Sequence, residues 1–179
     1  MANEILIKNG TPIVWANSGD FGGSPVARTH QIDLTSVAAG EAREGAKADL
    51  GATRAARYSV TLRPEMDAAT LSTAIVSMWF GQSPHATAGT ANPGGLTGAD
   101  ADYTGTAGDS LADSIHQLDK VGDLPCTSDA APVVQQRTWV FFPTERYVIP
   151  VVYNETLQAF EGDAVEMSII MTPLVDEVQ

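Results

Sequence analysis

The chain has 179 residues, of which 44% are hydrophobic, so it is long and apolar enough to bury the core of one domain over residues 1–179. Ten basic against 22 acidic residues give a net charge of −12, which argues against binding to nucleic-acid backbones or to an anionic membrane surface. No apolar run approaches the roughly 18 residues that would span a bilayer, and we expect a soluble protein.

The N-terminal 16 residues predict a β-hairpin. Residues 4–8 (EILIK) alternate as a short strand, and Asn9-Gly10 is a strong two-residue hairpin signal. Residues 11–16 (TPIVWA) form the returning strand, with its proline at the start, where a missing donor is tolerated. We expect this hairpin, residues 1–16, to pack at an edge of the sheet; the alternative is an arm that leaves the body to grip a neighbour.

Four further strands are predicted in the first half of the chain. Residues 26–34 alternate in part, and residues 43–51 alternate weakly, although their alanine and glutamate content also suits a helix. Residues 57–63 (RYSVTLR) alternate well, and residues 73–80 (TAIVSMWF) are the most apolar segment and predict a central strand. The inward-facing residues of the third strand are Tyr58, Val60 and Leu62.

Residues 81–108 form a long loop rich in glycine and alanine. Within it, residues 85–108 contain one leucine and one tyrosine, with no valine, isoleucine, methionine, phenylalanine or tryptophan. A loop of this length in a folded domain is usually functional or disordered, and so few large side chains do not offset the entropy of ordering it. We expect a neighbour, another subunit of the assembly, to hold it in place.

The second half of the chain predicts one short helix and more strands. Asp109 and Ser110 cap a helix that reaches Leu118, because its apolar residues recur at helical spacing. Strands are predicted at residues 121–126, 133–142, 147–153 and 163–171, followed by a surface-bound or loose acidic tail at residues 172–179. The chain therefore predicts an all-β fold, a jelly-roll-like β-sandwich of roughly eight to ten short strands with one short helix; a small barrel is the alternative.

A fixed offset of 89 residues relates two stretches of the chain. It places residues 57–62 on residues 146–151, and both stretches begin with an Arg-Tyr pair. The same offset places residues 76–78 on residues 165–167. We expect two related hairpin-like units, halves of one sandwich, with chance convergence on β patterning as the alternative. The arginines of the two pairs are predicted to bind acidic side chains at equivalent places.

Cys126 is the single cysteine, so the chain forms no internal disulfide and no cysteine-based metal site. Its apolar neighbourhood predicts a small buried hydrophobe. The N-terminal residues lack the basic and apolar regions of a signal peptide. Both features fit synthesis in a reducing cytoplasm.

Candidate catalytic and metal-ligating residues are scattered, and each has an ordinary structural explanation. The histidines lack metal-ligand spacing, the helix cap explains Ser110 without a nucleophile, and the tryptophans of the predicted strands suit a core. Asp100 and Asp102 would suit a Ca²⁺ loop, and four glutamates would suit a glycosidase pair, but solvated acids explain both sets. We therefore assign no catalytic, cofactor-binding or metal residue and expect no enzyme activity and no cofactor. The residues considered are His30, His85, His116, Asp109, Glu145, Glu155, Glu161, Glu166, Trp15, Trp79 and Trp139.

Two segments resemble small virion proteins of tailed bacteriophages. They are residues 83–118 (SPHATAGTANPGGLTGADADYTGTAGDSLADSIHQL) and residues 145–178 (ERYVIPVVYNETLQAFEGDAVEMSIIMTPLVDEV), with a less specific match at residues 42–60. The family is that of jelly-roll or β-sandwich capsid decoration (cement) proteins. The resemblance implies binding to the major capsid protein, self-association as a trimer or other homo-oligomer, and a place on the capsid surface of the virion after synthesis in the bacterial host. It implies no nucleic-acid or membrane partner and supplies no catalytic residues.

Two other functions stay open at this point. A tail tube or head-tail connector protein also uses a β-sandwich with a long loop, but it polymerises into rings. A carbohydrate-binding jelly-roll module would need exposed aromatic side chains or a Ca²⁺ site at Asp100 and Asp102.

Overall fold

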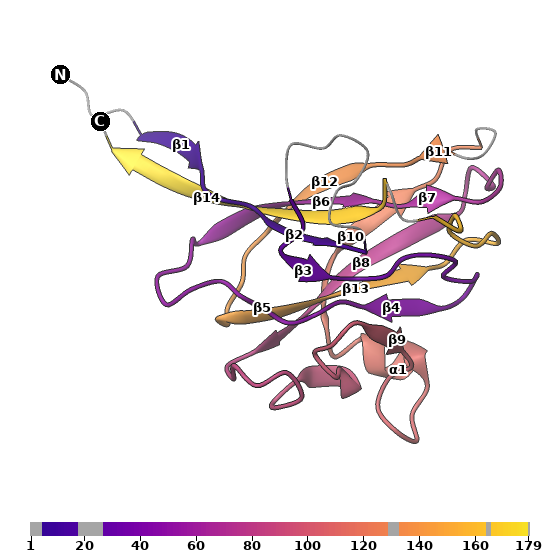
Figure 1. Ribbon diagram of the computed structural model, residues 1–179, viewed down its shortest axis with the longest axis horizontal. Coiled ribbons are helices and arrows are strands. Elements are labelled where there is room, and N and C mark those ends of the chain that lie inside the picture. The colour runs from indigo at the N-terminus through magenta and orange to yellow at the C-terminus, as the bar shows by residue number, and fades with distance from the viewer. Residues whose placement is uncertain (1–4, 18–26, 129–132, 164–165, 179) are drawn as a thin grey trace.

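The apolar faces of the strands assemble two β-sheets that pack against each other (Figure 1). The computed structural model describes residues 5–17, 27–128, 133–163 and 166–178. Sheet A contains β1 (Ile5–Asn9), β2 (Ile13–Ala16), β3 (His30–Gln31), β6 (Arg57–Arg63), β12 (Arg137–Phe141) and β14 (Ser168–Val178). Sheet B contains β4 (Ala42–Glu44), β5 (Ala48–Asp49), β8 (Ile75–Ser83), β9 (Ala101–Tyr103), β10 (Asp119–Pro125) and β13 (Tyr147–Asn154).

Three small elements complete the described structure. A separate two-stranded sheet pairs β7 (Glu65–Met66) with β11 (Val133–Val134). The helix α1 (Leu111–Ile115) and the 3₁₀ turn η1 (Pro93–Gly95) lie in the connection between β8 and β10. In the described residues, no helix is long and apolar enough to cross a membrane.

The strand order is that of a jelly roll. The main strands run β12-β6-β14-β2 in sheet A and β10-β8-β13-β4 in sheet B. Four of the pairings follow one another along a single long antiparallel ribbon. They are β2 with β14, β4 with β13, β6 with β12 and β8 with β10. Rolling this ribbon up adds the pairings of β6 with β14 and of β8 with β13. The predicted all-β, jelly-roll-like sandwich is confirmed.

The predicted hairpin-like repeats are wrong. β6 and β8 lie in different sheets, as do β13 and β14, and each strand pairs with a strand of the other predicted copy. The offset of 89 also joins opposite faces, because Val60 lies between the sheets whereas Ile149 lies on the far side of sheet B. A shift of one residue reverses the face of every side chain in a strand, and at an offset of 90 Tyr58 and Leu62 match the core residues Val148 and Val152.

The main core lies between the two sheets. The ring of Phe80 on β8 lies 4.8 Å from that of Phe141 on β12 and 6.1 Å from that of Trp15 on β2, measured between centroids. These contacts join sheet B to sheet A. Fully buried side chains from both sheets surround them, among them Leu62, Met78, Val152, Ile169 and Met171.

The two sheets differ in how many of their faces are covered. β6 alternates between buried and half-exposed residues, because one of its faces meets the core and the other meets solvent. β8 and β13 are buried along most of their length. A second apolar cluster covers their other face, and it is formed by Ala42, Trp79, Leu96, Tyr103, Ile115, Leu118, Ile149 and Val151. Half of this cluster comes from the glycine-rich connection and α1, so the connection is part of the packed body.

Two predictions are wrong, the N-terminal hairpin and the loose C-terminal tail. β1 and β2 do not pair with each other; they follow one another along the same strand, β14. Residues 172–178 belong to β14, which continues to Val178 although Pro173 offers no amide donor. The amide of Gly10, which we expected in a turn, donates to the carbonyl of Pro173 at 2.9 Å.

Three other predicted strands are shorter or broken. Of residues 26–34, only His30–Gln31 form a strand among those described, and position 26 lies outside the described residues. Residues 43–51 are extended as predicted but split at Gly45, where an added Cβ would lie 2.9 Å from Pro150 Cγ. Residues 133–142 divide into β11 and β12, which join different sheets. The breaks give more strands than predicted.

Replacing Phe80 with alanine should destabilise the protein by about 3–5 kcal/mol, because it removes a ring packed between the sheets. Phe142→Ala is the matched control: its ring is 63% exposed, and the expected change is within about 0.5 kcal/mol. Guanidinium chloride unfolding followed by tryptophan fluorescence measures both changes. Equal losses in the two variants would contradict the assignment of the core.

Candidate interaction surface

A two-stranded ribbon projects from the body at one end of sheet A. Figure 1 shows β1 and the end of β14 leaving the sandwich side by side. In its register, Ile7 lies opposite Asp176 and Lys8 opposite Val175. We call β1 and residues 174–178 of β14 the terminal ribbon. The amide of Gly10, bound to Pro173, marks where it joins the body.

Apolar side chains are exposed on both faces of the terminal ribbon. Ile7 is 60% exposed on one face, and Leu6 and Val175 are 42% and 44% exposed on the other. A two-stranded ribbon without a covering layer is only marginally stable in water. Ion pairs of Lys8 with Glu177, at 4.0 Å, and of Arg57 with Asp176, at 2.5 Å, balance its charges. Exposed apolar residues that lie together in this way mark interaction sites.

The terminal ribbon also presents unpaired backbone. Among the described residues, no strand pairs with the outer edge of β1 or with residues 175–178 of β14 on the side away from β1. Free strand edges are templates for pairing with another chain. The ribbon therefore offers both apolar side chains and backbone hydrogen-bonding groups to a partner.

Two further exposed apolar side chains lie at β12, on the outer face of sheet A. Val140 is 53% exposed and lies in the same cross-strand row as Thr172, through β6. Phe142, one residue beyond β12, is 63% exposed. Val140 and Thr172 lie on the same face of sheet A as Ile7, because Thr172 and Asp176 share a face of β14 and Asp176 is opposite Ile7. Polar residues separate these two side chains from the terminal ribbon, so the candidate surface is the ribbon itself.

The glycine-rich connection between β8 and α1 is held by its own chain. Lys47 lies in the break between β4 and β5, and its Nζ donates to Ser83 Oγ and to the carbonyls of His85, Thr87 and Thr90, at 2.8–3.2 Å. Burial lowers the pKa of Lys47. The ammonium group of Lys47 therefore holds the first turn of the loop together through its carbonyl groups.

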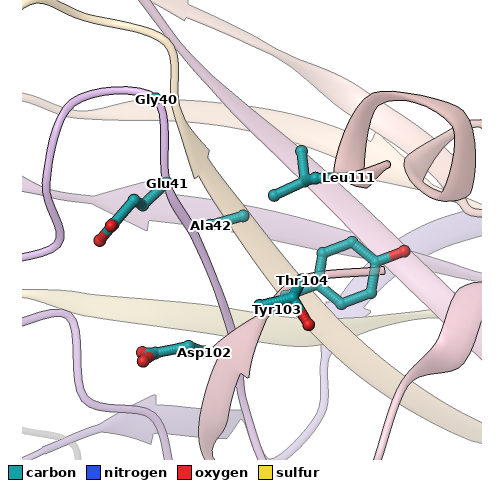
Figure 2. Close-up of a pocket in the computed structure, with 7 residues that line it drawn as sticks. All are labelled: Gly40, Glu41, Ala42, Asp102, Tyr103, Thr104 and Leu111. Carbon is teal, nitrogen blue, oxygen red and sulfur yellow. The ribbon is translucent and has the colours of Figure 1, made fainter. Parts of the chain in front are cut away.

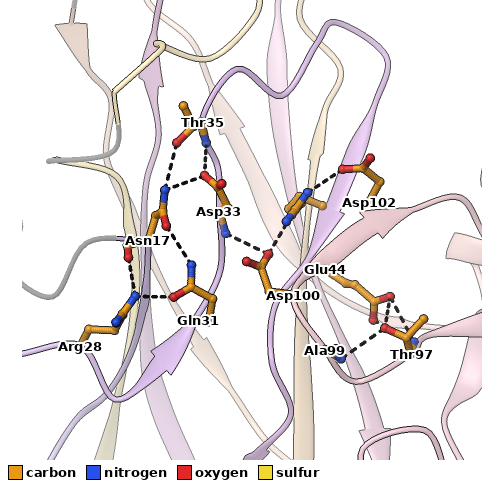
Figure 3. Close-up of polar contacts among 11 residues, drawn as sticks. Asn17, Arg28, Gln31, Asp33, Thr35, Glu44, Thr97, Ala99, Asp100 and Asp102 are labelled. Carbon is orange, nitrogen blue, oxygen red and sulfur yellow. Dashed lines mark hydrogen bonds and ion pairs between the residues drawn. The ribbon is translucent and has the colours of Figure 1, made fainter.

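A buried carboxylate holds the second turn. Glu44 is 1% exposed and accepts from the amide and hydroxyl of Thr97 and from the amide of Gly98, at 2.8–3.2 Å (Figure 3). Burial raises the pKa of Glu44 although these donors favour its charged form. The chain itself therefore supplies contacts that the sequence led us to expect from another subunit, and the subunit contact stays a prediction.

Arg43 binds the two aspartates considered for Ca²⁺. Its Nε donates to Asp100 Oδ1 at 2.8 Å and its terminal nitrogen to Asp102 Oδ1 at 2.7 Å. Asp100 also accepts from the amide of Asp33 at 3.0 Å (Figure 3). A guanidinium group bridges these carboxylates, so a Ca²⁺ site at Asp100 and Asp102 is wrong. The pair instead fixes β9 against β4.

A small hollow lies where this connection meets β4 (Figure 2). Its volume is about 250 Å³, and it is lined by Gly40, Glu41, Ala42, Asp102, Tyr103, Thr104 and Leu111. Ligand pockets usually enclose roughly 300–1,000 Å³. The hollow is smaller than this range, and we assign it no ligand.

The other sequence-derived candidates have separate, local roles. His30 packs 5.6 Å from Trp15, and burial lowers its pKa; His116 packs on the edge of Trp79. His85 Nδ1 accepts from the amide of Thr87 at 3.2 Å. The three histidines do not meet at one site in the described residues. The hydroxyl of Ser110 accepts from the amide of Asp113 at 3.1 Å, so the predicted helix cap is confirmed.

The tryptophans belong to the packed body, as expected. Trp15 is fully buried, Trp79 is 7% exposed, and Trp139 packs against the main core. Lys120 Nζ lies 5.2 Å from the ring centroid of Trp79. They do not form the exposed aromatic group that a sugar-binding surface needs. Cys126 is buried, which raises its thiol pKa.

The arginines of the two Arg-Tyr pairs each bind an aspartate, but not at equivalent places. Arg57 pairs with Asp176 on β14, and Arg146 binds both carboxylate oxygens of Asp49 on β5 at 2.7 Å. The Arg146 guanidinium holds the pKa of Asp49 below its usual value.

The four candidate glutamates do not share one site: Glu161 and Glu166 lie near Glu65, whereas Glu145 and Glu155 lie elsewhere. Glu155 accepts from the hydroxyl of Ser77, and the backbone amide of Glu161 donates to the carbonyl of Glu65. Glu166 lies close to Glu65 and to Asp163. Glu145 lies in the turn before β13, where its amide donates to Gln82. No glycosidase pair emerges from the four predicted candidates in the described structure.

Comparison with known proteins does not place the chain in a family. No protein-family model matches the sequence, and no curated protein matches it either. The functional interpretation therefore rests on the fold and on the surface described above.

Lys47→Met should loosen the first turn of the glycine-rich connection. The substitution keeps the apolar stem but removes the charged donor, and hydrogen bonds to charged groups contribute about 1.5–3 kcal/mol. Amide exchange in residues 84–92 should accelerate roughly 10- to 150-fold by hydrogen-exchange mass spectrometry. Lys120→Met, which removes an ammonium from an exposed ion pair, is the control. Unchanged exchange in Lys47→Met would show that this ammonium does not hold the loop.

Tyr103 makes the fold sensitive to alkaline pH. Its hydroxyl donates to the carbonyl of Gly94 at 2.7 Å, and burial together with the charge of Glu44 raises its pKa to about 12. A raised folded-state pKa stabilises the fold below about pH 10, and this contribution is lost as the pH rises towards 12.

The free energy of unfolding should therefore fall by about 1.4 kcal/mol through Tyr103 between pH 8 and pH 11. Tyr103→Phe should lose about 1 kcal/mol at pH 8, because it lacks the hydrogen bond, and should show a smaller further fall at pH 11. Denaturant unfolding at both pH values measures this. A variant with the same pH dependence as the parent would exclude Tyr103 as the cause.

Proposed function

We propose that this chain is a structural virion protein of a tailed bacteriophage, a capsid decoration or cement protein that binds the major capsid lattice and stabilises the head. The observation that carries the proposal is the terminal ribbon, which exposes apolar side chains on both faces and leaves strand edges unpaired. The resemblance of residues 83–118 and 145–178 to such proteins supports it.

The ribbon suits a partner that offers a sheet edge or a groove between subunits. An added strand gains backbone hydrogen bonds from the edge, and pockets for alternate side chains give specificity. Ile7 and Val175 point to opposite faces, so a partner that encloses the ribbon buries both. In this proposal, the ribbon inserts between neighbouring subunits of the capsid lattice and bridges them.

The rest of the molecule is compatible with a binding role. Its outer loop is fixed by Glu44 and Lys47, so the body docks without first ordering a long segment. The net charge of −12 keeps free copies apart and away from packaged DNA. Location on the capsid surface and self-association at local symmetry axes are parts of the same proposal.

A tail tube or head-tail connector is the competing function. There the ribbon would pair with a neighbouring copy of this chain, and purified protein would form rings by itself. The carbohydrate-binding alternative is less well supported, because its tryptophans are packed inside the body.

Binding of purified protein to capsids that lack it tests the proposal. Ile7→Ser and Val175→Ser should each weaken binding about 10- to 100-fold in a sedimentation assay, because each removes apolar area that the partner buries. Leu157→Ser is the matched control: Leu157 is 71% exposed, lies in the turn after β13, and should bind as the parent does.

Two outcomes would contradict the decoration function. One is parent protein that does not bind capsids but forms rings alone, which supports the tail alternative. The other is equal binding by the parent and the ribbon variants, which removes the ribbon from the interface. Cryo-electron microscopy of decorated heads would locate the ribbon directly.

A further inference from the structure

Three carboxylates meet at the end of sheet A opposite the terminal ribbon. Oxygen atoms of Glu65, Asp163 and Glu166 all lie within 4.8 Å of one another. β14 pairs with β6 so that Ser168 faces Arg63, and the same register continued by two residues places Glu166 opposite Glu65. Like charges directly opposite on adjacent strands repel.

A buried oxygen atom without a partner points to a missing ligand. Glu65 is 8% exposed, and its Oε2 has no hydrogen-bond partner. Burial, and then the charges of Glu166, Asp163 and Glu161, raise the pKa of Glu65. An unpaired carboxylate oxygen in such a place is costly. Arg63 does not relieve it, because it forms no ion pair within the described residues.

We propose that Glu65, Asp163 and Glu166 form a Ca²⁺ site that fastens the start of β14 to β7. Carboxylates are the ligands that Ca²⁺ prefers, at about 2.3–2.6 Å, so two oxygens on opposite sides of the ion lie roughly 4.6–5.2 Å apart. The three carboxylate oxygens lie within 4.8 Å of one another, which is close enough for one Ca²⁺ ion to contact all three. Mg²⁺ requires a stricter octahedron, dehydrates reluctantly and usually takes only one or two protein carboxylates, so a site of three carboxylates suits Ca²⁺ better.

The half-exposed position of Glu166 and the exposed position of Asp163 leave room for water on the remaining sides of the ion. Bound Ca²⁺ would neutralise the repulsion and give Glu65 Oε2 a partner. The ion would join residues far apart in the sequence, Glu65 on β7 and the pair Asp163 and Glu166 before β14. The site uses no residue of the terminal ribbon, so its test is independent of capsid binding.

Calcium titration of the purified, EDTA-treated chain tests the site. CaCl₂ at about 100 times its dissociation constant should raise the Tm by roughly 5–10 °C, and calorimetry should show one saturable site per chain. Glu65→Gln and Glu166→Gln should each lose the Tm shift and weaken Ca²⁺ binding at least about tenfold. Both variants remove repulsion, so they should fold without the ion.

Glu41→Gln is the matched control, because it removes one exposed negative charge outside the cluster and should keep the full shift. Three results would overturn the site. They are the absence of saturable Ca²⁺ binding by the parent, an equal shift in Glu65→Gln, and a shift reproduced by NaCl at the same ionic strength. In each case a proton on Glu65, rather than a metal ion, would relieve the cluster.

Discussion

Burial between the two sheets is the interaction on which the rest of the structure depends. Phe80 comes from sheet B, whereas Trp15 and Phe141 come from sheet A, so their contacts hold the rolled ribbon closed. Once this core is formed, sheet B still has an apolar outer face, which exposes Ile149 and Val151 unless another layer covers them. The glycine-rich connection and α1 supply that layer.

The long antiparallel ribbon that rolls up into the two sheets has a closed end, at the connection between β8 and β10, and an open end, at β1 and β14. At the closed end, the connection between β8 and β10 is fixed by an ammonium and a carboxylate three residues apart, Lys47 and Glu44. Both charges are directed into a loop made of small residues, whose backbone groups they satisfy. At the open end, β1 and the last residues of β14 extend past the core, and none of the described strands covers them. The contrast between a capped end and an open end is why we assign binding to the terminal ribbon.

Local patterns predicted the elements whose environment is local. Residues 57–63 alternate because one face is buried, and β6 has those bounds; the cap at Ser110 also depends on neighbours within three residues. Long-range contacts decided the rest. Asn9-Gly10 is a turn signal, but β14 offers a strand edge that keeps β1 and β2 in line. The anchors of the loop lie about 40 to 50 residues before the groups they bind, and Glu65 lies about 100 residues before Glu166, so no spacing rule connects them. In the sequence, Glu44 and Lys47 are marked only by their charge and by the glycine between them, Gly45.

The position of β14 has a consequence for biosynthesis. This strand lies between β2 and β6, although it comes last among the described elements. Until residues 168–178 have left the ribosomal tunnel, the nascent chain holds two strands with a vacant place between them and an unclosed apolar face. Pairings between such distant segments form slowly, and intermediates of this kind are prone to aggregate. Closure of sheet A therefore has to wait for β14, and the chain is most prone to aggregate before that strand is in place.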